Sequence, residues 1–289
     1  MVVCHPRFGA EPLWTTGFLI DRLRCRRRWM KGEWFGRPER AIVKTLSNAG
    51  ESVLKDHDRR GVVRRLEPEL WQLLCAACSE IRLLDSREVL SKAGDRIDVS
   101  ALLLEGLMAR YVRSSQRGEL QSAIVSISVP GDFVDLHALP LKRLDHDIGA
   151  LTPARIAIFP HAALDQIIDR SCCHARQLWG LTMIDASIHR HWIFRSSRLR
   201  ALASVADFVS EMDLRLQEAG EIRIDRLPLP LLQTDLAEIA GLSPVHVSRI
   251  CKELRESGAC TIRDGHAEIH DRALLHHLAH FDPSYLYPA

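Results

Sequence analysis

The spacing of hydrophobic residues changes twice along this chain, and each change marks a different predicted structure. From 66 to 79, apolar residues recur at steps of three and four, which predicts a short amphipathic helix. Between 81 and 159 they form short runs separated by turn residues such as Gly94-Asp95 and Pro130-Gly131-Asp132. That pattern is typical of a small antiparallel barrel or roll. After Pro160 the helical period returns.

Two long helical stripes follow the predicted roll. The first consists of Leu178, Leu181, Ile184, Ile188 and Trp192, and the second of Leu199, Leu202, Val205, Val209, Met212 and Leu216. Consecutive stripes need two apolar surfaces to bury them. One surface can be the roll or the last domain, and the other can be the same helix of a second subunit. Gly220, Pro228 and Pro230 then predict a linker, because glycine ends a helix and proline prevents another from forming.

The last sixty residues predict a helix-turn-helix followed by a hairpin. The run 232–240 has helical spacing, and Gly241 suits a left-handed stop. Ser243 can then cap a second helix that has Pro244 in its first turn. Two helices joined by a three-residue turn form a helix-turn-helix. Asp264-Gly265 is a preferred two-residue hairpin turn, and the strands on either side of it form the predicted wing.

The second of these helices separates apolar from basic residues. The positions expected to face a small core are Val247, Ile250, Cys251 and Leu254. The opposite face would lie in the major groove of DNA, where Arg249 has the length for a bidentate contact with guanine. Lys252 and Arg255 are better placed for phosphates. An ordinary helical pair with solvated charges is the alternative. The candidate DNA-contacting residues are Gln233, Ser243, Val245, His246, Ser248, Arg249, Lys252 and Arg255.

Composition adds a few constraints. The chain has 289 residues, enough for two domains, and a net charge of +2 that supports no argument from bulk electrostatics. Its eight cysteines lack the spacing of a disulfide framework, and we find no signal peptide, so we expect a cytoplasmic protein. No apolar run approaches the roughly 20 residues that span a bilayer, so no membrane partner is predicted.

The first sixty residues differ from the rest of the chain. They contain the basic, tryptophan-bearing run "RLRCRRRWMKGEW" at 22–34 and no sustained period. We interpret residues 1–60 as a basic, poorly ordered extension, or as sequence upstream of the true start. A nucleic-acid-binding or lipid-binding tail is the alternative.

Other reactive residues are few. His276 and His280 have the spacing of a shared metal site, but no carboxylate or cysteine completes it, so we predict no metal. Cys172 and Cys173 would be redox-reactive if exposed, although we expect them to be buried. The sequence has no Gly-rich phosphate loop, nucleophile elbow or metalloprotease helix, and therefore predicts no enzyme and no cofactor.

The run "QTDLAEIAGLSPVHVSRICKELRESGACTIRDGHAEIHD" resembles the winged helix-turn-helix of the Crp/Fnr family of bacterial transcription regulators. The upstream stretches "EVLSKAGD", "ALLLEGLMARYV" and "VSISVPGDFVDLH" are similar to the cyclic-nucleotide-binding-like β-roll of that family. The resemblance covers about residues 61–289. It implies a homodimer on an inverted-repeat site in double-stranded DNA, with RNA polymerase as a further partner and an unknown effector. The first helical stripe, at 178–192, is the candidate dimer seam.

Some positions depart from the family pattern. Where members that bind cyclic AMP have an arginine-serine pair, this chain has Asp145, His146 and Asp147, and acidic side chains would repel a phosphate. We therefore predict no cyclic-nucleotide binding, although Lys142 and Arg143 lie nearby. The cysteines lack the compact grouping of members with an iron-sulfur cluster, and Cys75 and Cys78 are expected to be buried.

The helix-turn-helix departs as well. Pro244 and Val245 replace the arginine-glutamate pair of many members, whereas their later arginine is kept as Arg249. Val245 would be able to contact a thymine methyl group. Leu232 stands where a capping threonine is common, so the first helix is expected to fray at its start.

These observations predict an α+β fold with an N-terminal antiparallel β-roll, a long dimerisation helix and a C-terminal winged helix-turn-helix. The predicted domains are an extension at 1–60, a sensor-like roll at 61–170, long helices at 171–219 and a DNA-binding domain at 220–289. The predicted function is sequence-specific transcription regulation. The alternative is a ligand-binding or protein-interaction module whose winged helix docks to a protein.

Overall fold

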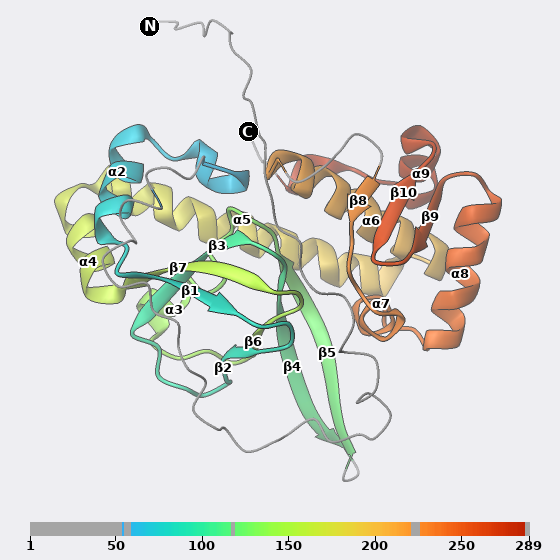
Figure 1. Cartoon of the computed structure of the whole chain (residues 1–289), viewed down its shortest axis with the longest axis horizontal. Coiled ribbons are helices and arrows are strands. Elements are labelled where there is room, and N and C mark those ends of the chain that lie inside the picture. The colour runs from blue at the N-terminus through green and yellow to red at the C-terminus, as the bar shows by residue number, and fades with distance from the viewer. Residues whose placement is uncertain (1–53, 55–58, 117–118, 221–225, 287–289) are drawn as a thin grey trace, which may run out of the picture. The chain divides into compact units, whose positions relative to one another are not determined.

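The computed structural model describes residue 54 and residues 59–116, 119–220 and 226–286. The prediction for residues 1–60 therefore lies almost wholly outside the described residues. Two sheets form the roll, one in the strand order β2-β6-β4-β5 and the other in the order β1-β7-β3, and all of their pairings are antiparallel. The predicted α+β fold with an antiparallel roll is confirmed (Figure 1). The strands are β1 (Glu80–Leu84), β2 (Val89–Ser91), β3 (Val99–Glu105), β4 (Met108–Gln116), β5 (Glu119–Ser128), β6 (Asp147–Ala150) and β7 (Ala154–Pro160).

Short helices flank the roll. The helix predicted at 66–79 is observed as α2 (Pro68–Ala77), in which Leu70 and Leu74 are buried; Leu66, just before the helix, is buried as well. Cys75 and Cys78 are buried there as expected. The remaining short elements are η1 (Gly61–Arg65), α3 (Ala138–Leu141) and α4 (His161–Arg170).

The predicted turn at Pro130-Gly131-Asp132 needs its glycine. Gly131 has a φ of +97°, and a Cβ atom at this position would lie 2.1 Å from the carbonyl oxygen of Arg60. Because any larger residue would force the backbone apart, Gly131 allows η1 to pack directly against the turn. Asp132, the next residue of this turn, pairs with Arg215 on one of the long helices.

Helix α5 (Cys172–Arg198) is the longest of the described elements. It extends from α4 toward the C-terminal unit, which comprises residues 201–220 and 226–286 (Figure 1). The stripe that we assigned to a dimer seam is buried within its own chain, since Leu178, Leu181, Ile188 and Trp192 are at most 7% exposed. The first two pack with α2 and α4, and the last two pack with α6 (Ala201–Glu218) and β5. The prediction that this stripe forms the seam is therefore wrong.

A different apolar stripe of α5 is exposed. Trp179, Met183, Ile193 and Phe194 are 64%, 48%, 67% and 49% exposed. At about 100° per residue these four positions fall on one side of the helix, opposite the buried stripe. The expected burial of Cys172 and Cys173 is also wrong, because both are exposed at the start of α5.

The C-terminal unit is built on α6 (Ala201–Glu218), which packs against α9 and α8. The segment predicted as a linker contains β8, which adds a third strand to the wing by pairing with β10. Among the described residues, none of the helices has the length and apolar character to cross a bilayer. The other elements are β8 (Arg226–Pro228), α7 (Gln233–Ala240), α8 (Pro244–Glu256), β9 (Cys260–Arg263), β10 (His266–Ile269), α9 (Arg272–Ala279) and η2 (Pro283–Tyr285).

Candidate nucleic-acid interface

The turn between α7 and α8 has the geometry that its residues predict. Gly241 ends α7 in the left-handed region, with a φ of 63°. Ser243 Oγ accepts a hydrogen bond of 3.3 Å from the amide of His246, and Pro244 is the first residue of α8. A capping serine followed by proline stabilises the start of a helix, because one free amide gains an acceptor and proline has no amide to satisfy. The beginning of α8 is thus firmly defined.

Helix α8 is anchored on one side and open on the other. Val247 and Leu254 are fully buried, and Ile250 is 5% exposed. Of the predicted contact residues, those that are exposed are Gln233, Ser243, Val245, Ser248, Arg249, Lys252 and Arg255, whereas His246 and the predicted core residue Cys251 are half-buried. The predicted separation into an apolar face and a polar face is therefore confirmed.

The basic residues of α8 differ in their surroundings. Lys252 Nζ lies 3.6 Å from Glu256 Oε1, in a pair whose side chains are both more than 60% exposed. Within the described part of the chain, Arg249 and Arg255 form no ion pair with another side chain. Exposed pairs of the first kind contribute about 0–1 kcal/mol, so Lys252 is also available to an outside anion at little cost.

The wing adds a basic residue, Arg263, that is not among the predicted contact residues. Asp264 and Gly265 both have positive φ, at 51° and 75°, as the predicted tight hairpin requires. Arg263 comes directly before this turn, and its nearest carboxylate, on Glu268, is 3.8 Å away and partly exposed. Arg263 could have been identified from the sequence, because it directly precedes the predicted hairpin turn. This position makes Arg263 a further candidate for phosphate contact.

The start of α7 is held by a residue of the roll. Leu232 provides no capping side chain, but Asp235 Oδ2 accepts a hydrogen bond of 2.8 Å from the Leu232 amide. Both oxygens of Asp235 also accept hydrogen bonds from Arg87, at 2.9 and 2.5 Å, and Arg87 lies between β1 and β2. This bidentate pair connects the roll to the helix-turn-helix at the point where fraying was expected.

The loop that would face a cyclic phosphate is occupied by internal contacts. Asp147 is 5% exposed, and its carboxylate accepts hydrogen bonds from the Ala93 amide at 2.7 Å and pairs with Arg113 at 2.8 Å. Arg110, the buried cation nearby, donates to Asp185 at 2.9 and 2.8 Å and to the carbonyl of Val134. Burial lowers the pKa of His137 to about 4, so this imidazole is neutral at pH 7. Arg110, Arg113 and His137 therefore offer no free positive charge to a phosphate.

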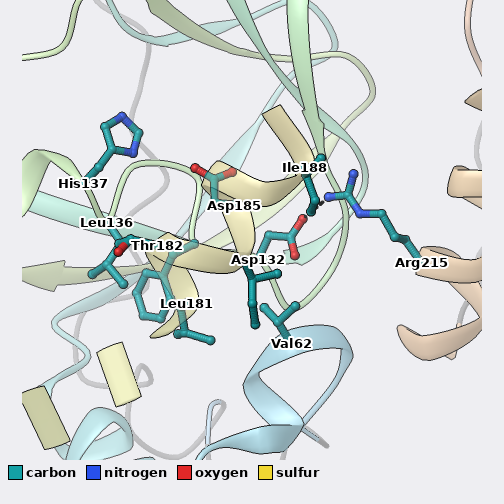
Figure 2. Close-up of a pocket in the computed structure, with 11 residues that line it drawn as sticks. Val62, Asp132, Leu136, His137, Leu181, Thr182, Asp185, Ile188 and Arg215 are labelled. Carbon is teal, nitrogen blue, oxygen red and sulfur yellow. Dashed lines mark hydrogen bonds and ion pairs between the residues drawn. The ribbon is translucent and has the colours of Figure 1, made fainter. Parts of the chain in front are cut away.

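A small cavity lies where the roll meets α5 and α6 (Figure 2). It has a volume of about 30 Å³, which would hold a water molecule. Asp132 and Arg215 point toward each other at its edge, with 2.6 Å between Asp132 Oδ2 and Arg215 Nη2. Burial raises the pKa of Asp132 and outweighs the effect of Arg215. The cavity therefore marks a polar junction between the roll and the C-terminal unit.

Other candidate ligands remain apart. His189 and His191 face different partners, since His189 lies near Arg110 and His191 near Asp207. His276 packs against Phe281, with ring centroids 5.0 Å apart. Among the described residues, no group of three or more histidine, cysteine, aspartate or glutamate side chains is arranged to hold a metal ion.

Comparison with known proteins places this geometry among regulators. Residues 205–278 match the Crp-like helix-turn-helix domain family, whose match begins inside α6. The nitrogen fixation regulation protein FixK of Bradyrhizobium diazoefficiens is 30% identical over 181 residues, covering 61% of this chain and 72% of that protein. The anaerobic regulatory protein of Pasteurella multocida is 23% identical over 192 residues, covering 66% of this chain and 69% of that protein.

A solved structure shares the fold of the roll and the C-terminal unit. FixK2 from Bradyrhizobium japonicum has a TM-score of 0.62 and 20% sequence identity. The alignment covers 68% of this chain and 96% of that one.

Proposed function

This chain belongs to the Crp/Fnr family of transcription regulators, and on that basis we propose that it recognises an inverted-repeat DNA site as a homodimer. In this proposal each subunit inserts α8 into the major groove of one half-site. The observation that carries it is the division of α8, in which buried Val247 and Leu254 fix the helix and exposed Arg249 is left without an ion pair among the described residues. Arg249 would contact a base, and Lys252 and Arg255 would contact phosphates.

The start of α8 would determine which sequence is preferred. Val245 is 72% exposed there, and a valine side chain offers only apolar contact, which suits a thymine methyl group. Gln233, Ser243, His246 and Ser248 complete the proposed contact surface. Because the arginine-glutamate pair of many family members is missing, we expect a half-site that differs from theirs at the corresponding base pairs.

The exposed stripe of α5 supports the homodimer. Large apolar side chains on a surface helix mark an interaction site when they are contiguous. On one side of a helix of 27 residues, Trp179 and Met183 form one such group and Ile193 and Phe194 a second, with the exposed Arg190 between them. A second copy of α5 packed on this side would bury both stripes around a two-fold axis. The same symmetry would present two α8 helices to half-sites roughly 34 Å apart.

Control by cyclic AMP is not part of the proposal. The Asp147 carboxylate already accepts a hydrogen bond from the Ala93 amide and pairs with Arg113. Arg110 already donates hydrogen bonds to Asp185 and to the carbonyl of Val134. A cyclic phosphate would have to displace these contacts and approach the carboxylates of Asp145 and Asp185, at a cost that rises as water is excluded. We expect cyclic AMP to leave DNA affinity unchanged.

Binding to duplex DNA at two salt concentrations tests the proposal. Contacts from Lys252 and Arg255 of two subunits would neutralise several phosphates, so affinity for duplex DNA should fall by at least tenfold between about 50 and 200 mM salt. A fluorescence anisotropy titration with a mixed-sequence duplex measures this change. An absence of DNA affinity at about 50 mM salt would contradict the proposal and favour docking of the winged helix to a protein.

A further inference from the structure

The C-terminal turn of the chain is packed into the elbow between α5 and α6. Tyr285 in η2 donates a hydrogen bond of 3.1 Å to Glu211 Oε2 on α6. Its ring also stacks on His191 of α5, with ring centroids 3.7 Å apart and planes 8° from parallel. The next residue, Leu286, is fully buried. One tyrosine therefore contacts both sides of the elbow.

Glu211 accepts hydrogen bonds from several side chains at this point. Trp192 Nε1 lies 3.1 Å from both of its oxygens, and Arg215 Nη1 donates to Oε1 at 3.0 Å. Arg195 also donates to it. Burial favours the protonated acid, but the two guanidinium groups outweigh burial and lower the pKa of Glu211 below its ordinary value. An ionised carboxylate is a strong acceptor, so these bonds hold α5, α6 and η2 in a directional arrangement.

A second carboxylate strengthens the same elbow. Arg195 Nε donates to Asp207 Oδ2 at 2.5 Å, and His191 Nε2 lies 2.9 Å from the same oxygen. Arg195 is 1% exposed, and its guanidinium lies over the Trp192 ring, 4.8 Å from the ring centroid. Apolar packing alone tolerates sliding of one helix over another, whereas hydrogen bonds to buried charges define one geometry.

The network continues into the roll. Arg215 bonds Glu211 with one nitrogen and Asp132 of the roll with the other, at 2.6 Å. Asp132 follows Gly131 in the turn beside the small cavity. The direction in which α6 leaves α5 is thus set by contacts from the roll on one side and from the C-terminal turn on the other.

We propose that Tyr285 is a positioning residue for DNA recognition, because the C-terminal turn fastens the elbow and so fixes the direction of α8 relative to α5. The inference rests on the proposed function, since a fixed direction matters only if two α8 helices must reach two half-sites together. Tyr285 is distant in sequence from every candidate contact residue and needs no contact with DNA. Its effect would appear in the geometry of binding by two subunits.

The test compares Tyr285→Ala, Tyr285→Phe and the exposed control Ser284→Ala. DNA affinity is measured for an inverted repeat selected from a random pool and for a single half of it. For Tyr285→Ala we expect the affinity for the full repeat to fall roughly tenfold while half-site affinity changes less than about twofold. Tyr285→Phe keeps the ring stack and removes the hydrogen bond, so its loss should be smaller. Ser284→Ala should resemble the natural protein.

Limited trypsin digestion gives a readout that needs no DNA. Arg198 and Arg200 flank the elbow, so a loosened elbow should be cut there faster in Tyr285→Ala than in Ser284→Ala. If the natural protein binds no DNA, the proposed function fails, yet the digestion still tests the fastening. Equal losses on the half-site and the full repeat, or unchanged cleavage at the elbow, would overturn the inference.

Discussion

At the scale of single residues, we propose different roles for two basic residues of α8, Arg249 and Lys252. Arg249 lies between the capped start of the helix and its middle, is exposed, and forms no ion pair among the described residues. Lys252 is one turn further along and already lies near Glu256. A guanidinium can contact two guanine atoms in a fixed plane, whereas an ammonium group acts as a point charge. We therefore propose that Arg249 contacts a base and that Lys252 contacts a phosphate.

This difference predicts distinct effects of two alanine variants. Arg249→Ala should weaken binding to the selected site by about 1–3 kcal/mol more than binding to random DNA. Lys252→Ala should weaken both to the same extent and reduce the slope of affinity against salt by about one unit. Titrations of each variant with both duplexes, at several salt concentrations, provide the comparison. If Arg249→Ala lowers both affinities equally, Arg249 touches phosphate only.

At the scale of elements, local patterns predicted the helix-turn-helix but not its attachment. Ser243, Pro244 and Gly241 act on their immediate neighbours, so their effect on the turn follows from the sequence. The pairing of Arg87 with Asp235 joins residues 148 positions apart, and no periodicity indicates it. Tyr285 and Glu211 are 74 positions apart. Contacts of this kind depend on the packing of whole elements and were missed.

Helix α5 shows a second limit of sequence patterns. It has apolar residues on opposite sides, at Leu178 and Leu181 on one side and at Trp179 and Met183 on the other. A helical period shows that a stripe is apolar, but it does not say which stripe the chain buries itself and which it leaves for a partner. The structure resolves this for the folded chain and moves the proposed dimer surface to the exposed stripe.

The exposed stripe gives a direct prediction for Ile193→Asp. Ile193 is 67% exposed in the single chain, so aspartate there should change the free energy of unfolding of one subunit by less than about 0.5 kcal/mol. In a dimer it would bury a carboxylate against apolar side chains, and we expect a monomer at micromolar concentration. Analytical ultracentrifugation of this variant measures the change, with Ala273→Asp on α9 as a control for the added charge. A dimer that persists in Ile193→Asp would place the interface elsewhere.

At the scale of the whole molecule, the described elements form a chain of contacts from the roll to the helix-turn-helix. The roll contacts the C-terminal unit through Arg87 with Asp235 and through Asp132 with Arg215. The class of fold and the order of its parts were predictable because the period of the sequence changes where the architecture changes. The third wing strand was not, because β8 has only three residues and includes a proline.

Selection of bound duplexes from a random DNA pool, followed by sequencing, tests the proposed homodimer and its base contacts together. We predict an inverted repeat whose half-site centres are one helical turn, roughly 34 Å, apart, with a guanine where Arg249 reaches. The same arrangement should be recovered with and without cyclic AMP. A pool with no enriched sequence, or an enriched single site without two-fold symmetry, would contradict the proposed binding of a homodimer to an inverted repeat.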